Sequence, residues 1–399
     1  MKVKRYVAVL LACAGVVFAS GCTIPTEDSH SAPPIENTIG IPPSFTVGDG
    51  AVVSPSQTIE VHTFGTELVA AKLVNDAGEV VAELGGQGKL ESQTSTSSWR
   101  VTEPLGYGRE YTLTARDSEG QTVESTFETL TPSYKAEVYL MPSDMEVGVG
   151  QTVNVQFDIS IPDAYKEAAE QTVTVTADPP TEGAFYWVNE SQLRWRPKDH
   201  WQPGTKVHVE AKPFGTQLGK ATWGGDNVEA DFTIGDEVIA YVDNNTKIMT
   251  VTKNGETVKT MPVSMGRDGG RWSTPPGTYI IGDKNPSMIM DSETFGLSHE
   301  QGGYRTKVNY ATQMSYSGIY VHAAPWSVWA QGNTNTSHGC INVSTDNAKW
   351  FQDFVKRGDL VVVTNTTGPE FSPYDGLGDW NFDWDTISKD SSSEDSSAS

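Results

Sequence analysis

Apolar and polar residues alternate with a period of two along much of the N-terminal half of the chain, which predicts half-buried β-strands. Residues 70–74 and 111–115 are clear examples. Short runs rich in Asn, Asp, Ser and Gly follow them, at residues 75–78 and 117–120. An alternating segment that ends in such a run is typical of a β-hairpin.

The spacing of these strands suits two successive immunoglobulin-like β-sandwiches, residues 41–132 and residues 133–235. In the second, residues 173–177 alternate cleanly, and residues 185–188 and 192–195 predict a hairpin. Neither region contains cysteine, so apolar burial alone must stabilise each of them. We expect three tryptophans of the second sandwich to lie in its core rather than to form a sugar-binding platform: Trp187, Trp195 and Trp201.

Residues 236–366 predict a third domain of mostly β-structure, because longer strands follow one another closely there. One helix is expected near its end, where Ser344 or Thr345 can cap the start and Gly358 can end it. The apolar face and the last turn of this helix comprise Trp350, Phe351, Phe354, Val355, Lys356 and Arg357. The expected fold class is therefore mainly β, with two immunoglobulin-like sandwiches before a β-rich domain that has one flanking helix.

Two segments follow this domain. Residues 376–384 are too aromatic to be disordered, so we expect residues 367–387 to pack back on the third domain. Residues 388–399 are almost entirely serine and acidic residues, which predicts a disordered tail.

The N-terminus is typical of a targeting segment. Three basic residues precede an uncharged apolar run that is short for a transmembrane helix but suits a signal peptide. Small residues before Cys22 resemble a bacterial lipobox, although Ala19 stands where leucine is usual. We predict a lipoprotein signal peptide at residues 1–21, lipidation of Cys22 and a disordered tether at residues 22–40. The protein would then be exported and anchored to the cell membrane. A cleaved signal and a soluble secreted protein are the alternative.

The charge of the chain excludes one class of partner. There are 28 Lys and Arg residues against 51 Asp and Glu residues, a formal net charge of −23. No basic cluster follows the first five residues, and contacts to phosphates need clustered Lys and Arg. Nucleic acid is therefore not an expected partner, and the acidity fits solubility in an exposed location.

The three cysteines are Cys13, Cys22 and Cys340. Cys13 would leave with the signal peptide, so lipidation of Cys22 would make Cys340 the one thiol of the mature protein. Exported proteins normally use cysteines in pairs, and an unpaired cysteine suggests a reactive thiol. A buried, inert Cys340 and a Cys22–Cys340 disulfide are alternatives that the count leaves open.

His322, His338 and Cys340 are the candidates for catalysis. A nearby imidazole can take the proton of a thiol and so create the nucleophile. His338 would share a face with Cys340 on an extended segment, and His322 ends an alternating strand. Gly339 permits close approach of a substrate to main-chain N–H groups, which would form an oxyanion hole. A zinc site is the rival, but the sequence lacks the usual spacings of zinc ligands.

Residues 322–342, with Ser-His-Gly-Cys-Ile-Asn at residues 337–342, resemble the signature of the L,D-transpeptidase (YkuD-type) catalytic domain. Mycobacterial-type enzymes of this family also carry one or two immunoglobulin-like domains before the catalytic one, and often a lipobox. The resemblance therefore covers most of the mature chain. Further similar segments are residues 235–240, 290–292, 303–306, 311–318 and 376–381.

The resemblance implies a two-step acyl transfer in the bacterial cell wall, so the protein would face the wall from the membrane. Cys340 attacks the penultimate diamino acid of a donor tetrapeptide stem and expels the terminal D-alanine. The side-chain amine of an acceptor stem then takes the acyl group, which gives a diaminopimelate–diaminopimelate cross-link. The family also implies acylation by carbapenems. No cofactor or metal is expected, and residues 217–220 lack the acidic side chains through which some relatives bind calcium.

The roles of single residues are implied in the same way. Cys340 is the nucleophile and His322 is its base. The family usually has a serine after this histidine and orients the ring through the backbone carbonyl of that serine, where this chain has Ala323. His338 and Gly339 shape the turn of the nucleophile, and their main chain, with the N–H of Cys340, is expected to form the oxyanion hole. Seven residues match substrate-contacting, wall or lid positions: Met290, Tyr304, Ser317, Gly318, Trp326, Ser337 and Asn342.

Residues 323–336 and 295–303 are expected to act as lids that limit hydrolysis of the acyl-enzyme. The tether and the sandwiches suggest a spacer that carries the catalytic domain to the wall. Two rivals stay open. One is a thiol endopeptidase of the wall, in which the cysteine usually precedes its histidine. The other is a non-catalytic scaffold lipoprotein, against which the complete motif argues.

Overall fold

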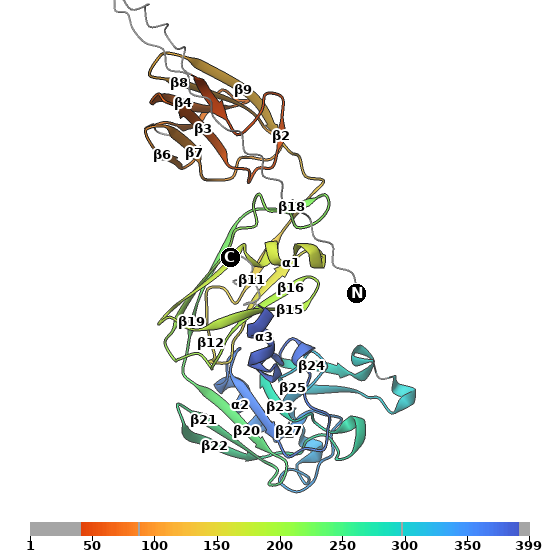
Figure 1. The fold of residues 1–399 in the computed structure, drawn as a ribbon. Helices are drawn as coiled ribbons and strands as arrows, with labels where there is room; N and C mark the ends of the chain where they lie inside the picture. The colour runs from red at the N-terminus through yellow and green to blue at the C-terminus, as the bar shows by residue number, and fades with distance from the viewer. Residues whose placement is uncertain (1–40, 87, 297, 391–399) are drawn as a thin grey trace, which may run out of the picture.

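The structure is a computed structural model that describes residues 41–390 except residues 87 and 297. The predicted signal peptide, Cys22, the tether and residues 391–399 lie outside the described residues. The described chain forms three bodies in a row (Figure 1), which follow one another in chain order. Its last part then returns to the middle body, where α3 lies beside β15 (Figure 1).

The first body is a sandwich of two sheets, with strand orders β1-β3-β7-β6 and β2-β9-β8-β4-β5. Its inward-facing residues include Trp99, Leu113 and Phe127, each at most 1% exposed. Both predicted hairpins are present, since β4 pairs with β5 and β8 pairs with β9. The strands are β1 (Ile41–Phe45), β2 (Val52–Val53), β3 (Ile59–Phe64), β4 (Leu68–Asn75), β5 (Val80–Glu83), β6 (Ser92–Thr94), β7 (Ser98–Val101), β8 (Glu110–Asp117) and β9 (Thr122–Thr129).

The second body is also a sandwich, with strand orders β11-β13-β16-β15 and β12-β19-β17-β14. A two-stranded parallel sheet of β10 and β18 lies at its end nearer the first body. The strands are β10 (Tyr134–Ala136), β11 (Val138–Met141), β12 (Met145–Val147), β13 (Val153–Phe157), β14 (Val173–Asp178), β15 (Gly183–Asn189), β16 (Gln192–Pro197), β17 (Lys206–Ala211), β18 (Thr222–Gly224) and β19 (Val228–Ile234).

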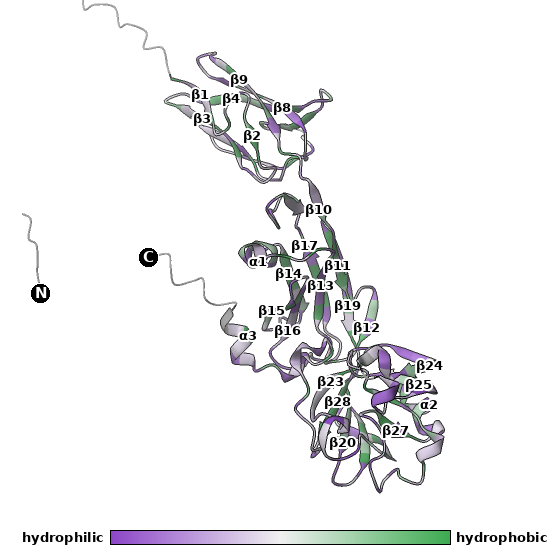
Figure 2. Ribbon diagram, turned by 90° about the vertical axis from the view of Figure 1, so that its right-hand side faces the viewer, coloured by the Kyte–Doolittle hydropathy of each residue, from purple (hydrophilic) through white to green (hydrophobic). Residues whose placement is uncertain are grey.

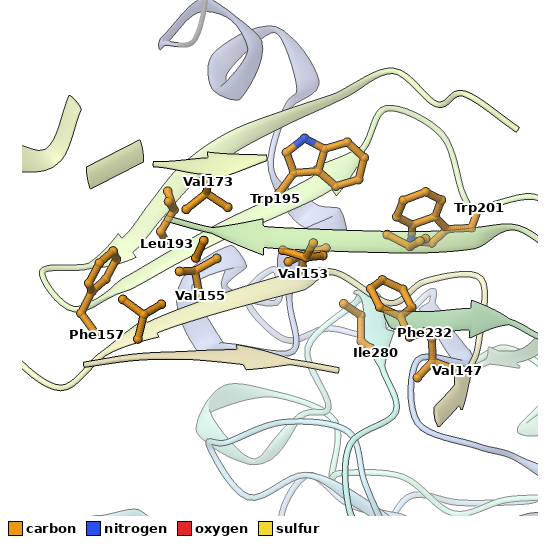
Figure 3. Packing of buried hydrophobic residues seen from close by; sticks show 14 of the residues in the cluster. Val147, Val153, Val155, Phe157, Val173, Leu193, Trp195, Trp201, Phe232 and Ile280 are labelled. Carbon is orange, nitrogen blue, oxygen red and sulfur yellow. The ribbon is translucent and has the colours of Figure 1, made fainter. Parts of the chain in front are cut away.

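Two of the three tryptophans expected in this core are buried there. Trp195 is 6% exposed and Trp201 is 2% exposed, and their rings lie 5.3 Å apart. Trp187 is half-buried and stacks on Phe157 with ring centroids 5.8 Å apart. Ile280 of the third body enters the same core (Figure 3), so this apolar cluster extends beyond the sandwich itself.

The second sandwich contains a helix that sequence analysis did not predict, α1 (Asp163–Glu170). Of its eight residues only Ala169 is buried. A single buried position gives no apolar period for a pattern to detect, and two turns of helix are near the limit of what such a pattern can show.

The third body contains two sheets, with strand orders β22-β21-β20-β28-β23 and β24-β25-β26-β27. Val251, Met265 and Phe351 are fully buried in its core. Asn254 and Gly255 both have positive φ, as the two-residue turn between β21 and β22 requires. The strands are β20 (Val238–Asp243), β21 (Ile248–Lys253), β22 (Glu256–Pro262), β23 (Gly277–Ile280), β24 (Lys284–Asp291), β25 (Arg305–Gln313), β26 (Tyr320–Ala323), β27 (Ile341–Val343) and β28 (Leu360–Thr364).

The predicted helix of this body is α2 (Thr345–Phe354). Ser344 caps it, since its Oγ accepts a hydrogen bond from the N–H of Asn347 at 3.2 Å. The predicted C-terminal end was wrong by one turn, because the backbone of Val355 is already extended. Burial of Val355 in the core pulls the chain out of the helix before Gly358 is reached.

The C-terminal segment, residues 367–390, contains η5 (Pro373–Asp375), η6 (Asp379–Asn381) and α3 (Trp384–Asp390). It packs on the third body as predicted, through Asn381, whose amide nitrogen donates to Thr278 O at 2.8 Å. It also packs on the second sandwich, which was not predicted, through Ile387 against Ala184 and Tyr186. The predicted disorder was wrong for residues 388–390, because they belong to α3.

The second sandwich and the third body share a wide junction. The N–H groups of Gly148 and Gly150 donate to the carbonyls of Arg357 and Gly358, both at 2.8 Å. Beneath them Arg194 forms an ion pair with Asp379 at 3.3 Å, with the two side chains 6% and 0% exposed. The hydroxyl of Tyr186 also donates to Asp379.

The junction between the two sandwiches centres on one side chain, Tyr107. Its hydroxyl donates to Gly224 O and accepts from Gly215 N, both at 2.8 Å. Its ring packs against Phe214, 4.7 Å away between centroids, and against Trp223 at 6.5 Å.

Apolar residues lie mainly along the strands of all three bodies (Figure 2). Among the described residues, no helix has the length and apolar character needed to cross a bilayer.

Candidate active site

Two parallel strands bring the catalytic candidates together. β26 pairs with β27 in the register Val321 to Ile341 and His322 to Asn342. Cys340 stands immediately before β27, so the strand pairing places the sulfur and the imidazole at the same end of the sheet. The segment between the two strands, residues 324–340, folds over this end.

Cys340 has a free thiol that is buried but borders a cavity. The residue is 5% exposed, and its Sγ lies 3.5 Å from the carbonyl oxygen of Gly318. Burial raises the pKa of this thiol to about 12, although a hydrogen bond from the N–H of Tyr320 acts in the opposite direction. The resting residue is therefore a neutral thiol, and its proton must leave during the reaction.

His322 is held in one tautomer. The residue is 4% exposed, and its Nδ1 lies 3.0 Å from the carbonyl oxygen of Ala323. A carbonyl oxygen can only accept a hydrogen bond, so Nδ1 carries the proton and Nε2 keeps a free lone pair. Burial also lowers the pKa of His322, which keeps the ring neutral and able to accept a proton.

The two groups line one cavity of about 160 Å³, which we call the first cavity. It contains most of the residues that sequence analysis selected, together with Thr306 and Val308 of β25, which it missed. The complete lining is Met290, Tyr304, Thr306, Val308, His322, Trp326, Thr336, Ser337, His338, Cys340 and Asn342.

Asn342 lines this cavity and has an unpaired side-chain acceptor. The residue is 3% exposed, and its Nδ2 donates to Ser327 Oγ at 3.2 Å. Its Oδ1 is buried without a hydrogen-bond partner among the described residues. A buried polar atom of this kind is costly unless a partner satisfies it.

The turn that carries the nucleophile, residues 337–340, is not extended as expected. Gly339 has φ +129°, a conformation that favours glycine, so His338 and Cys340 do not alternate along a strand. Instead His338 turns toward aromatic neighbours, and its ring lies 4.9 Å from Tyr304 and 4.6 Å from Trp272 between centroids.

Hydrogen bonds within this turn decide which N–H groups are free. Ser337 Oγ accepts from Gly339 N at 3.1 Å and donates to Cys340 O at 2.6 Å. Thr274 Oγ1 supports the turn from outside by donating to Gly339 O at 2.8 Å. The N–H of Gly339 is therefore occupied, whereas sequence analysis had included this residue in the oxyanion hole.

A second cavity, of about 280 Å³, lies on the other side of Tyr304 and His338. Sequence analysis did not separate the two cavities, although Ser317 and Gly318 line the second only. It also missed Arg271 and Trp272. The lining of the second cavity is Arg271, Trp272, Ser292, Gly296, Tyr304, Ser317, Gly318, Ile319 and His338.

The loop that carries Ser317 and Gly318 is held by the C-terminal segment. Both carboxylate oxygens of Asp375 accept main-chain hydrogen bonds, from Tyr316 N at 2.7 Å and from Ser317 N at 3.0 Å. The next residue, Gly376, has no room for a side chain, because a Cβ would lie 2.4 Å from the ring of Tyr316. Asp375 therefore shapes one wall of the second cavity from a segment far along the chain.

The two predicted lids are anchored in different ways. Residues 323–336 are fixed near their end by Asn335, whose Nδ2 donates to Asn244 Oδ1 at 2.7 Å, while Trp326 and Trp329 are 52% and 70% exposed. The lid at residues 295–303 lies at the tip of the β24–β25 hairpin. Asp291 closes that tip by pairing with His299 at 2.9 Å and with Arg305 at 3.2 Å.

Two groups of described residues have the ligand atoms of three His, Cys, Asp or Glu side chains close enough to hold one metal ion. They are His208, Glu210 and Glu229 on the second sandwich, and Asp291, Glu293 and His299 at the hairpin tip. Neither contains Cys340, and both are partly or fully exposed. The donor set that a zinc site at the thiol would need is thus not assembled in the described part of the chain.

Comparison with known proteins follows the division into bodies. Residues 50–217 match the bacterial Ig domain family, and residues 237–363 match the L,D-transpeptidase catalytic domain family. The first match covers most of the two sandwiches, and the second contains every residue of the first cavity.

Similar whole chains come from Mycobacterium tuberculosis. L,D-transpeptidase 2 is 50% identical over 347 residues, which are 85% of this chain and 82% of the relative. L,D-transpeptidase 5 is 31% identical over 389 residues, which are 95% of this chain and 80% of the relative. A solved structure of an L,D-transpeptidase in complex with imipenem aligns with a TM-score of 0.50 at 35% identity, and covers 58% of this chain and 100% of the solved chain.

Proposed function

Because the chain belongs to the L,D-transpeptidase family, we propose that its active site cross-links peptidoglycan stems by two acyl transfers at Cys340. The observation that carries this proposal is the shared first cavity. It contains a free thiol and a buried neutral imidazole whose Nδ1 is bound to Ala323 O. A nucleophile, a base and a group that orients the base are the parts that thiol acyl transfer needs.

In the first step, the Sγ of Cys340 forms a bond to the carbonyl carbon of the penultimate diamino acid of a donor stem. Nε2 of His322 takes the thiol proton as that bond forms, because the raised pKa of Cys340 disfavours a free thiolate in the resting site. The same proton then passes to the nitrogen of the terminal D-alanine. The C–N bond breaks, D-alanine leaves, and a thioester remains.

In the second step, the side-chain amine of an acceptor stem attacks the thioester. Nε2 of His322 accepts a proton from this amine, and the C–S bond breaks as the new amide forms. The proton returns to the sulfur, which restores the neutral thiol. The net exchange is one amide for another, and it needs neither a cofactor nor a redox partner.

Main-chain N–H groups of the nucleophile turn stabilise the oxyanion of each tetrahedral intermediate. Since the N–H of Gly339 donates to Ser337 Oγ, we assign this role to the N–H groups of Cys340 and His338. Asn342, Met290 and Trp326 line the same cavity, so we assign a polar contact with the stem to Asn342 and the apolar walls to Met290 and Trp326.

Incubation of the protein with a purified disaccharide-tetrapeptide tests the proposal. We expect release of D-alanine and a cross-linked dimer by mass spectrometry, and neither product from Cys340→Ser. A cleaved stem without dimer would indicate an endopeptidase, and no turnover would favour a scaffold. Imipenem gives an independent readout, because acylation of Cys340 would add the mass of the drug to the wild-type chain and not to the variant.

We also propose that the protein is exported and held at the membrane by a lipid on Cys22, with its catalytic domain directed toward the wall. The lipobox-like sequence before Cys22 supports this. Mass spectrometry of the purified N-terminal peptide tests it, since a diacylglyceryl group would be absent from Cys22→Ser.

A further inference from the structure

The second cavity contains a cation and an aromatic ring to which no role has yet been given. Arg271 and Trp272 lie on η1 (Gly270–Trp272), and the guanidinium of Arg271 stacks over the indole of Trp272 at 4.4 Å. The same indole meets the ring of His338 edge-on at 4.6 Å. A chain of contacts therefore connects Arg271 to the turn that carries Cys340.

This cation stands out against the composition of the chain. The formal net charge is −23, and the nearby Arg305 is paired with Asp291 at 3.2 Å. Arg271 makes no ion pair with any carboxylate of the described residues, and its Nη2 donates a hydrogen bond to the main-chain oxygen of Gln301 at 2.8 Å. A guanidinium has five N–H donors, so most of its capacity is unused.

Its charge acts on His338. The positive charges of Arg267 and Arg271 both lower the pKa of His338, in addition to the larger effect of desolvation. Arg267 also lies over this indole, 5.3 Å from the ring centroid. The wall of the second cavity next to His338 is therefore positive in a protein that is otherwise strongly negative.

The position of the two cavities determines what can reach Arg271. Both cavities border Tyr304 and His338, and the sulfur of Cys340 touches Gly318 O, which belongs to the lining of the second cavity. A peptide whose carbonyl sits at the sulfur can thus extend its neighbouring groups into the second cavity. A stem peptide carries carboxylates on both sides of the bond that is cut.

We propose that Arg271 is a specificity-determining residue that binds a carboxylate of the stem peptide in the second cavity. This rests on the transpeptidase function proposed above. A planar guanidinium matches a carboxylate with two parallel hydrogen bonds, and stacking on Trp272 holds the plane in place before the substrate arrives. The carboxylate comes either from the terminal D-alanine or from a side branch of the stem, and selective amidation distinguishes these two sources.

The competing role for Arg271 is a structural one, since its hydrogen bond to Gln301 connects η1 to the lid at residues 295–303. The two roles differ in how they depend on the substrate. Loss of the hydrogen bond to the lid would lower kcat/KM for every donor alike. Loss of the partner of a carboxylate would lower kcat/KM only for a donor that carries this carboxylate as the free acid.

The experiment compares wild type, Arg271→Gln and Arg271→Lys, with Arg116→Gln on the first sandwich as a control for the lost charge. Each is given three disaccharide-tetrapeptides: the free acid, one with the C-terminal carboxyl amidated, and one with the side-branch carboxyls amidated. Release of the C-terminal residue and formation of acyl-enzyme give kcat/KM for each donor.

For wild type, we expect one of the amidations to lower kcat/KM by about tenfold, the size typical of losing a charge-assisted pair at a partly exposed site. On the free acid, kcat/KM of Arg271→Gln should be about tenfold below that of wild type. Amidation of the carboxylate that Arg271 binds should not lower kcat/KM of this variant further. Arg271→Lys should be intermediate, and Arg116→Gln should match wild type.

An equal loss of kcat/KM on all three donors would overturn the proposal and favour the structural role, in which Arg271 holds the lid at residues 295–303. An unchanged kcat/KM for Arg271→Gln on the free acid would overturn it as well. Failure of the transpeptidase function itself would look different, because wild type would then release no D-alanine from any donor.

Discussion

The two junctions of this molecule are held together by different kinds of interaction. Between the two sandwiches, one tyrosine, Tyr107, provides two hydrogen bonds and an aromatic contact. Between the second sandwich and the catalytic domain, a buried ion pair, main-chain hydrogen bonds and a shared apolar core act together. Figure 1 shows the same contrast, since the C-terminal segment returns across the second junction and not across the first.

This difference indicates that the second sandwich belongs to the catalytic unit and that the first does not. The second junction leads directly to the active site. Arg194 of the sandwich donates to Gly376 O at 3.0 Å, and the neighbouring Asp375 holds the loop that carries Gly318. A change at the second junction should therefore affect stability and catalysis, whereas a change at the first should affect neither on soluble substrates.

The largest effect is expected at the buried ion pair. Arg194→Met leaves Asp379 without its partner in a fully buried site, where desolvation already raises the pKa of the carboxyl. We expect the free energy of unfolding to fall by about 3–5 kcal/mol, measured by denaturant unfolding. Arg109→Met is the matched control, because its exposed pair with Asp76 should contribute less than about 1 kcal/mol. Equal losses for both variants would contradict the contrast between the junctions.

The second effect depends on pH. Asp359 is fully buried next to Gly148, and burial raises its pKa from 3.8 to about 7. The folded state then holds this proton more tightly than the unfolded state. The stabilisation is complete below pH 3.8 and is lost as the pH rises from 3.8 to 7, by up to about 4 kcal/mol at 1.36 kcal/mol per pKa unit.

Asp359→Asn removes this titration. Thermal unfolding should be measured at pH 5 and at pH 8. We expect the melting temperature of the variant, relative to that of wild type, to be higher at pH 8 than at pH 5. A gap that stays constant between the two pH values would show that Asp359 titrates in its ordinary range.

The third effect is on catalysis more than on stability. Asp375→Ala removes both acceptors of the loop at Tyr316 and Ser317, so the wall of the second cavity loses its fixed position. We expect kcat/KM for D-alanine release to fall by about tenfold, because small misplacements at a reaction centre are costly. Asp375→Asn, which keeps one acceptor oxygen, should recover part of the rate.

Asp383→Ala is the control for this prediction, since Asp383 lies in the same C-terminal segment and its carboxylate accepts a hydrogen bond from Asp385 N. It should leave the rate unchanged. A similar loss of rate for both variants, with a fall in melting temperature, would show that Asp375 acts through the general stability of the segment.

The smallest effect in solution is expected when residues 41–132 are deleted with the leader and tether retained. The first junction centres on one tyrosine, so its loss should hardly change the active site. We expect kcat/KM on a soluble disaccharide-tetrapeptide to stay within about twofold of wild type. Cross-linking in cells should fall, because the catalytic domain would reach less far into the wall. Equal losses in both assays would contradict the role of the first sandwich as a spacer.

Much of this architecture follows from local pattern. Alternation predicted strands such as β4, β8 and β14, and the turns after β4 and β8 were located correctly, because both signals depend on neighbours within a few residues. Helix α1 and the early end of α2 were missed for the opposite reason. Their boundaries are decided by which side chains the tertiary core buries, Ala169 and Val355 among them.

In the candidate site, too, some residues could be predicted from the sequence and others could not. The motif at residues 337–342 drew attention to Cys340 and to the histidines, since chemistry and spacing are both visible in the sequence. Arg271 and Asp375 carried no such signal. They lie more than 30 residues from Cys340 along the chain, in segments without a motif, and only the folded chain brings them to the second cavity.

By itself, then, the sequence determined that the chain is mainly β, that it carries one reactive thiol motif, and that the motif follows two sandwich-like regions, because short-range periodicity and residue chemistry are local properties. Only the tertiary structure decided which nitrogen of His322 is free, which N–H groups of the turn are occupied, and which sandwich belongs to the catalytic unit. Those answers depend on hydrogen bonds and burial between segments far apart in the chain, and no local pattern specifies such contacts.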